Sequence, residues 1–541
     1  MKTERLSGIL LHPTSLPSSA GIGTIGKEAF AFVDWLEKAG QRIWQILPIG
    51  PTGYGDSPYA SFSTFAGNPL LIDIDALVEN SILSSEKKEE PDWIKREGNV
   101  DFGSVVWWKI PLLMEAAQNY ARLIRNNKPG SKTPSDSDYS ESSYNSFITE
   151  HSYWLDEYAL FMSIKEFFDK KAQEEKIHGA MWSCYWPEKL AMHDENSVTE
   201  WKKDHQTEIE NHKIIQFFFF TQWKKLKAYA NSKHIAVIGD IPIFVASDSS
   251  DVWANQSLFL LEKSGVQKFA AGVPPDYFSA TGQLWGNPLY DWHAMKKENY
   301  GWWISRIKAM LRLVDYVRID HFRGFESFWA IPYGAKTAVH GEWKKGPGSA
   351  LFKAIKKELG SIPVIAEDLG IITDEVRSLR DEFSLPGMKV LQFAFSCGEA
   401  EKGALVNAFL PHEYTENYVV YPGTHDNDTS RSWFTHLSQD EKKLISSYLN
   451  ADIDGIPVTE ENLPLLFIKE AFSSVARIAV FPLQDLYSLG KEARMNTPST
   501  AGGTNWQWRM SAAMLSSPLA DAKAQWLKKL SVLYDRNSLS E

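Results

Sequence analysis

Cysteine is scarce in this chain, whose 541 residues include only Cys184 and Cys397. Two cysteines cannot form the disulfide framework that stabilises many small secreted proteins. The scarcity suits a reducing compartment, in which thiols stay reduced. We therefore expect a fold that does not depend on disulfide bonds.

Long apolar runs are also missing. No stretch reaches the roughly 18 apolar residues that suggest a membrane-spanning helix. The first residues, MKTERLSGILLHPTSLP, lack the apolar core of about 7–15 residues found in secretory signal peptides. The longest apolar segment, IIQFFFF at 214–220, is interpreted as a buried helix face. We expect a soluble, cytoplasmic protein.

Positive charge is in deficit, because 57 Lys and Arg residues face 68 Asp and Glu residues and the net charge is −11. Proteins that bind a nucleic-acid backbone or an acidic membrane surface usually present an excess of basic groups. The sequence therefore predicts neither nucleic acid nor membrane as a partner.

Aromatic residues are abundant, with 21 Trp, 20 Tyr and 29 Phe making up 13% of the chain. Large aromatic side chains can simply build a core. They are also flat apolar platforms against which the C–H faces of sugar rings stack. Composition alone leaves both interpretations open.

Short apolar segments that end in polar residues recur along the chain, and helix-period segments link most of them. Near-continuous apolar runs are expected of parallel strands buried on both faces. The candidates are 8–13, 43–49, 235–243, 315–320, 363–368, 388–395, 417–426 and 477–485. Eightfold repetition predicts an α/β fold, a (β/α)8 TIM barrel, although a doubly wound sheet has the same local pattern.

The spacing of these strands is uneven and locates insertions. About 190 residues separate the second strand from the third, far more than one helix needs. We predict a single catalytic barrel unit, 1–541, with large inserted subdomains after strands 2 and 3. The first covers approximately 70–210 and is mostly helical, and the second covers approximately 244–300.

Polar residues gather where the predicted strands end, which in a barrel is the face that carries the active site. Any one of them could be a helix cap or part of a salt bridge. Together they predict a polar catalytic centre. These residues are His12, Asp240, Arg318, Asp320, Glu367, Asp368, His425, Asp426 and Asp485.

Three of these carboxylates, Asp320, Glu367 and Asp426, suit glycosidic chemistry, in which one carboxylate attacks and one acid protonates the leaving oxygen. Arg318 lies two residues before Asp320 and points to the same side of a strand. We expect this cation to keep Asp320 ionised. Glu367 must instead hold its proton, which requires a raised pKa.

The same segments carry a family resemblance that extends nearly end to end. VRIDHFRGF (317–325), AEDLG (366–370) and GTHDND (423–428) resemble the catalytic strands of the 4-α-glucanotransferases, the amylomaltase or disproportionating-enzyme family of the α-amylase clan. Further matching segments are GILLHPTSLPS (8–18), GVPPDYFSATGQLWGNPLYDW (272–292) and RMNTPSTAGGTNWQWR (494–509). The family usually has glycine where this chain has Ser499.

The resemblance implies a retaining enzyme that moves α-1,4-glucan segments from a donor maltodextrin to the 4-OH of an acceptor glucan or glucose. Asp320 would form the covalent glycosyl intermediate, and Glu367 would be the acid/base. Asp426 would grip sugar hydroxyls in the transition state. The implied partners are maltooligosaccharides and starch or glycogen dextrins, with no cofactor and no metal.

Substrate-binding roles follow from the same resemblance. Arg318 and His425 would hold the sugar in the bond-cleaving subsite, with Asp240 and His321 nearby. Tyr59 would stack on the donor sugar. Tyr54, Phe278 and Trp285 would line the glucan groove, the last two from the acceptor-side loop 272–292. For each aromatic, core packing is the alternative. The implied set is Tyr54, Tyr59, Asp240, Phe278, Trp285, Arg318, His321, His425 and Asn496.

Two local patterns point elsewhere and carry little weight. GIGTIG (21–26) matches a dinucleotide-binding glycine pattern, but prolines intervene after the strand and no acidic-ended second strand follows closely. HDND (425–428) could suggest a metal site with His12 and His321. However, no His or Cys pair has ligand spacing on a helix, and sugar transfer through carboxylates needs no metal.

Two other functions remain open beside the transferase. The nearer is an α-glucan hydrolase of the same clan, which would share all three carboxylates and use water as acceptor. The farther is a glucan-binding scaffold without catalysis, which the presence of all three carboxylates disfavours.

Overall fold

The computed structural model describes residues 4–88, 90–94, 97–125, 137–275, 279–395, 407–449, 455 and 457–537. Within these ranges, no helix combines the length and the apolar character that crossing a membrane requires.

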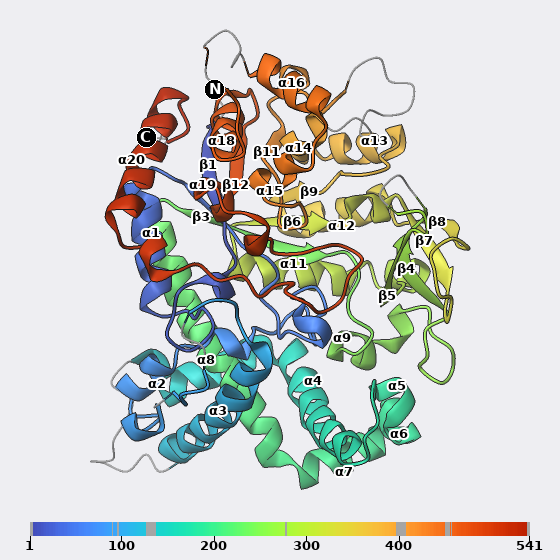
Figure 1. Ribbon diagram of the computed structural model, residues 1–541. Coiled ribbons are helices and arrows are strands. Elements are labelled where there is room, and N and C mark those ends of the chain that lie inside the picture. Colours follow the sequence, from blue (N-terminus) through green and yellow to red (C-terminus); the bar gives the residue numbers. More distant parts are fainter. Residues whose placement is uncertain are drawn as a thin grey trace.

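A central sheet of eight parallel strands forms the barrel (Figure 1), in the order β10-β11-β12-β1-β2-β3-β6-β9. The two end strands of this order, β9 and β10, also meet. The backbone N–H of Ala366, the last residue of β9, donates to the carbonyl of Pro386, just before β10, at 2.8 Å. The predicted (β/α)8 barrel is confirmed, and the doubly wound alternative is wrong. The strands are β1 (Leu6–Leu10), β2 (Ile43–Gln45), β3 (Ala236–Pro242), β6 (Tyr316–Asp320), β9 (Val364–Ala366), β10 (Gly387–Val390), β11 (Tyr418–Tyr421) and β12 (Ile478–Pro482).

In two of the apolar segments that suggested strands, a short helix follows the strand directly. In the segment 388–395, β10 ends at Val390 and the short helix α14 (Leu391–Ala394) follows at once. In the segment 477–485, β12 ends at Pro482 and α19 (Leu483–Leu486) follows. A short apolar run fits a buried strand and a buried helical turn equally well, so the sequence does not locate the boundary.

Helices cover the outside of the barrel and bury one apolar face each. In α1 (Lys27–Lys38), Ala29, Phe32, Val33 and Leu36 are all buried. Burial of each large apolar side chain contributes about 1.5–3 kcal/mol. The other long helices of this layer are α8 (Gln206–Ser232), α11 (Gly301–Leu313), α12 (Ser349–Leu359), α13 (Asp374–Glu382), α18 (Leu463–Ser473) and α20 (Pro518–Leu533).

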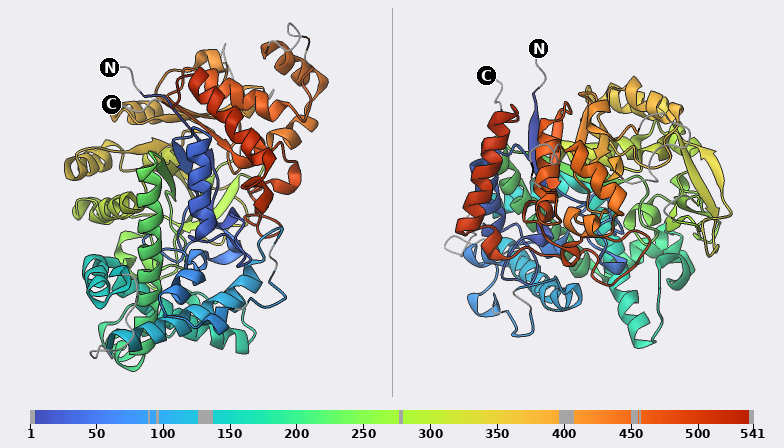
Figure 2. Two further views of the ribbon diagram at one scale, coloured as in Figure 1. Left: turned by 90° about the vertical axis from the view of Figure 1, so that its left-hand side faces the viewer. Right: turned by 45° about the horizontal axis from the view of Figure 1, so that its top comes forward.

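The first and last elements lie side by side (Figures 1 and 2). Arg536, just after α20, donates from Nη1 to the carbonyl of Leu6 in β1 at 3.1 Å. Its Nη2 donates to the carbonyls of Ala471, near the end of α18, and of Ser474 and Ala476, between α18 and β12. The C-terminal helix is therefore tied to the first strand and its neighbour.

The chain between β2 and β3 forms a helical region at the bottom of Figure 1. Its apolar segment IIQFFFF lies in α8, where Phe217, Phe218 and Phe219 are buried. The helices before α8 are α2 (Ile74–Glu79), α3 (Phe102–Arg125), α4 (Glu141–Glu174), α5 (Trp182–Tyr185), α6 (Glu188–Ala191) and α7 (Glu195–Asp204).

A second, antiparallel sheet lies beside the barrel, at the right of Figure 1, in the order β5-β4-β7-β8. β4 (Phe269–Val273) and β5 (Gln283–Pro288) come from the chain after β3. β7 (Ser327–Pro332) and β8 (Glu342–Lys345) come from the chain after β6, where the sequence predicted no insertion. β7 pairs with β4, which is distant in sequence, and local periodicity carries no information about this pairing.

Candidate active site

Arg318 lies at the centre of the polar residues inside the barrel. Its Nη1 donates to Oδ2 of Asp240 at 2.6 Å, and its Nη2 donates to Oδ1 of Asp320 at 3.0 Å. Asp240 and Arg318 are register partners in the neighbouring strands β3 and β6, which sets them at the same level. Burial opposes the charge of Arg318, but the two carboxylates raise its pKa well above the usual range.

Asp320 ends β6 and faces opposing influences. Burial raises the pKa of Asp320, the Arg318 guanidinium lowers it, and Glu367 raises it again, so that the pKa lies well above its usual value. Arg318 therefore acts in the expected direction, toward an ionised Asp320, but does not bring the pKa down to its usual value. One cation, shared with Asp240, does not outweigh desolvation and several neighbouring carboxylates.

Glu367 directly follows β9, and two backbone groups orient it. The N–H of His321 donates to Oε2 at 2.7 Å, and the N–H of Leu369 donates to Oε1 at 2.9 Å. Burial raises the pKa of Glu367, although Arg318 and these two N–H groups oppose the shift. Because Asp320 and Glu367 titrate together, the pair retains a proton to higher pH than isolated carboxyls would. The direct contact with Arg318 favours the negative charge on Asp320 and the proton on Glu367.

His321 has a left-handed backbone, with φ 55° and ψ 50°, which is unusual for a residue other than glycine. In this conformation, the backbone N–H of His321 donates to Oε2 of Glu367. Burial lowers the pKa of its imidazole to about 3, so the ring is neutral. The ring of Trp285, from β5, lies nearly perpendicular to this ring at a centroid distance of 4.7 Å.

Asp368, adjacent to Glu367, has a structural part. The N–H of Met388 donates to its Oδ1 at 2.7 Å, and Arg380 bonds its Oδ2. Both oxygens of Asp368 thus hold neighbouring segments together.

Tyr59 connects two other members of the predicted site. Its hydroxyl lies 2.8 Å from Oδ2 of Asp240 and 2.8 Å from Nε2 of His425. An ionised carboxylate only accepts, so the hydroxyl donates to Asp240 and His425 donates from Nε2 to Tyr59. Burial lowers the pKa of His425, which favours the neutral ring. The rings of Tyr59 and His425 stack at 5.4 Å.

Asp426 lies on the turn after β11 and is reached from the C-terminal part of the chain. The side-chain amide of Asn496 donates to its Oδ1 at 2.7 Å, and Nε2 of His425 lies 3.4 Å from its Oδ2. The backbone N–H of Asn496 also donates to the carbonyl of His425 at 3.1 Å. Ser499, in the same loop, has a φ of 65°, the left-handed region that favours the glycine usual in the family.

Most of the predicted site residues therefore come together, and two remain without a side-chain description. Tyr54 begins a short 3-10 turn, Tyr54–Asp56, on the loop after β2. Phe278 lies outside the described residues. The sequence analysis gave no role to Trp506, whose ring lies 5.6 Å from Tyr59 and 6.0 Å from His425, or to Arg494. Both lie in the segment 494–509, whose resemblance to the family was the sequence feature that could have identified them.

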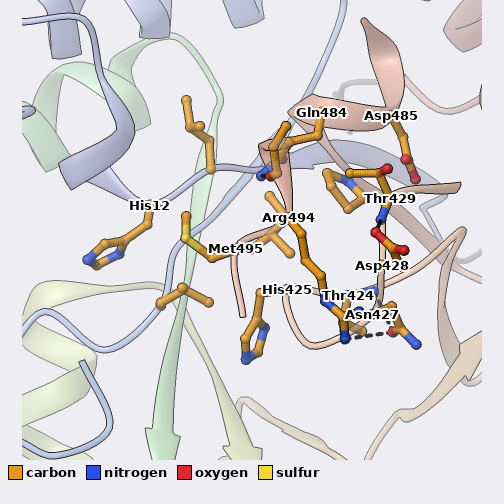
Figure 3. Close-up of a pocket in the computed structure, with 15 residues that line it drawn as sticks. His12, Thr424, His425, Asn427, Asp428, Thr429, Gln484, Asp485, Arg494 and Met495 are labelled. Atoms are coloured by element: carbon orange, nitrogen blue, oxygen red, sulfur yellow. Dashed lines mark hydrogen bonds between the residues drawn. The ribbon is translucent and has the colours of Figure 1, made fainter. Parts of the chain in front are cut away.

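A cavity of about 30 Å³ lies beside His425, which is one of the residues that line it (Figure 3). A cavity of about 10–15 Å³ can hold one water, so this one has room for about two. It is lined by His12, Asp428, Gln484, Asp485, Arg494 and Met495, among others. Across the described ranges, no group of three or more His, Cys, Asp or Glu side chains is arranged to hold a metal ion.

The barrel and the acidic cluster at the carboxyl ends of its strands define a (β/α)8-barrel enzyme. Residues 11–515 match the profile of the 4-alpha-glucanotransferase family. The 4-alpha-glucanotransferases of Synechocystis sp. and Thermus thermophilus are 46% and 45% identical; the alignments cover 94% and 95% of this chain and 94% and 97% of theirs. The chain belongs to this family.

A solved structure supports the same assignment. The amylomaltase from Streptococcus agalactiae, in complex with acarbose, superposes with a TM-score of 0.88 at 35% identity. The match covers 99% of this chain and 100% of that one. The amylomaltase fold thus extends over the whole barrel and its insertions.

Proposed function

We propose that this enzyme is a retaining 4-α-glucanotransferase that acts through a covalent glycosyl–Asp320 intermediate. It transfers α-1,4-glucan segments from a donor maltodextrin to the 4-OH of an acceptor glucan or glucose. The observation that carries the proposal is the difference between the two carboxyls: the Arg318 guanidinium bonds Asp320 directly, whereas Glu367 is bonded by the neutral backbone N–H groups of His321 and Leu369.

In the first half of the reaction, Asp320 attacks the anomeric carbon of the donor. Glu367 gives its proton to the glycosidic oxygen, and the reducing-end fragment leaves with a new hydroxyl group. One C–O bond breaks as the bond to Asp320 forms. Arg318 supports the ionised form of Asp320 in this step, and Asp426 would bind sugar hydroxyls as positive charge develops on the ring.

In the second half, Glu367 acts as a base. It takes the proton from the 4-OH of an acceptor, whose oxygen attacks the anomeric carbon and releases Asp320. Two inversions retain the α configuration of the donor. Tyr59, Asp240, His321, His425 and Asn496 would hold the sugar at the cleavage point, and Tyr54, Trp285 and Phe278 would line the groove.

Hydrolysis is the competing outcome, since water can attack the same intermediate. A transferase must hold the acceptor and shield the intermediate, and positioning can supply several kcal/mol. Membership of the 4-alpha-glucanotransferase family favours transfer.

Incubation with maltotriose separates the candidates. Transfer gives glucose, maltose and a ladder of longer maltodextrins, and the number of reducing ends stays constant. Hydrolysis gives shorter products only, and reducing ends increase. An unchanged substrate would leave only a binding scaffold.

Two substitutions test the assigned roles. Asp320→Asn should abolish turnover and covalent trapping but retain acarbose binding, because the fold does not require that charge. Glu367→Gln should slow both half-reactions, and a donor with a good leaving group should partly rescue the first. Near-normal turnover of Glu367→Gln on maltodextrins would move the acid/base role to another residue.

A further inference from the structure

Asp426 depends on contacts from outside its own strand. Asp320 ends β6 and Glu367 directly follows β9, whereas Asp426 lies in the turn beyond Tyr421, the last residue of β11. Its side chain is 40% exposed. The position of this carboxylate therefore depends on the hydrogen bonds that hold the turn.

Arg494 and Asn496 supply contacts that hold the turn, in addition to the hydrogen bonds within it between Thr424 and Asn427. Arg494 donates from Nη2 to the carbonyl of Asp426 at 3.0 Å and from Nε to the carbonyl of Asn496 at 2.7 Å. The side chains of Asp426 and Asn496 are bonded to each other at 2.7 Å. One guanidinium thus bridges the carbonyls of the two residues whose side chains meet. Figure 3 shows the Arg494 side chain extending toward the turn that carries Thr424, His425 and Asn427.

We infer that Arg494 is a positioning residue for Asp426, holding the third carboxylate of the site through the main chain of two loops. A planar guanidinium offers rigidly placed donors, so it can serve two carbonyls at once. The ammonium group of lysine is a compact point charge and does not reproduce this fork. The inference rests on the proposed function, in which Asp426 acts in the transition state.

Kinetics of Arg494→Ala distinguish positioning from a merely structural role. We expect kcat for maltotriose disproportionation to fall about 10- to 100-fold, since displacement of a catalytic group by about 1 Å has effects of this order. KM and the affinity for acarbose should change far less than kcat. Added guanidinium ion should restore part of the activity of Arg494→Ala, and Arg494→Lys should recover less than guanidinium does.

Arg42→Ala is the matched control. Arg42 also donates to a backbone carbonyl, that of Lys233 at 3.3 Å, but it precedes β2 and so lies at the opposite end of the barrel. Its replacement should leave kcat and KM unchanged. A loss of activity in Arg494→Ala that follows only a lowered Tm, without guanidinium rescue, would overturn the inference.

A double-mutant cycle tests whether Arg494 acts through Asp426. Adding Arg494→Ala to Asp426→Asn should lower the residual rate no further, because the group being positioned is already lost. Multiplicative losses, with an active wild type, would overturn this inference alone. A wild type that transfers no glucan would overturn the proposed function together with it.

Discussion

Arg318 donates to Asp240 at 2.6 Å inside the barrel, where the two side chains are 3% and 0% exposed. Removing one partner of a buried ion pair leaves an uncompensated charge and costs about 3–5 kcal/mol. Asp240→Ala leaves Arg318 with Asp320 as its remaining carboxylate partner. It should therefore lower the free energy of unfolding by at most about that amount, measured by chemical denaturation. In the control Asp521→Ala, the lost pair with Lys38 has the same 2.6 Å length but is half exposed. It should cost less than about 1 kcal/mol. Equal losses would contradict the role assigned to burial.

The hydroxyl of Tyr59 sets the tautomer of His425 through its bond to Asp240. Tyr59→Phe keeps the stacked ring and loses both hydrogen bonds, so we expect kcat/KM to fall about tenfold, equivalent to about 1.4 kcal/mol. Tyr229→Phe is the control, because Tyr229 also bonds a carboxylate, Asp34, but at the surface. Similar losses in both variants would show that the effect is not specific to the site.

Trp285 contributes an aromatic face that is 38% exposed beside His321. If it positions the acceptor sugar, Trp285→Ala should lower transfer more than hydrolysis, because water needs no aromatic platform. Glucose release unmatched by longer products, together with a rise in reducing ends, measures the change. Tyr316→Ala replaces an equally exposed aromatic residue at the other end of β6 and should leave the ratio unchanged. An unaltered ratio in Trp285→Ala would place acceptor selection elsewhere.

His12 is buried, and burial lowers its pKa to about 3 from an ordinary value of 6.5. Between these values the unfolded chain binds a proton that the folded protein does not, so stability falls as the pH drops from 6.5 toward 3. The shift sets an upper limit of about 5 kcal/mol. His12→Gln should flatten the dependence of Tm on pH over this range. His293→Gln, at an exposed histidine, should not.

The eight strands were predictable because each is a short, nearly continuous apolar run, and that pattern is local. Asp320, Glu367 and Asp426 were predictable as site residues because they lie at the polar ends of such runs. Asp240 was predictable because it lies in the third predicted strand. The boundaries of secondary-structure elements were harder to predict. The segment 388–395 contains a strand and a helical turn, and both are apolar and buried. The pairing of β7 with β4 also could not be foreseen, since no local pattern records it.

By itself, then, the sequence determined the barrel, the family, and that Asp320, Glu367 and Asp426 lie at or just beyond the ends of strands, because periodicity and ordered motifs are written along the chain. Only the tertiary structure decided that Arg318 is shared between Asp240 and Asp320, that Tyr59 joins Asp240 to His425, and that Arg494 spans two loops. It also decided that burial and neighbouring carboxylates raise the pKa of Asp320 despite the contact with Arg318. Such properties depend on distances between remote segments and on desolvation summed over all neighbours, which no single stretch of sequence contains.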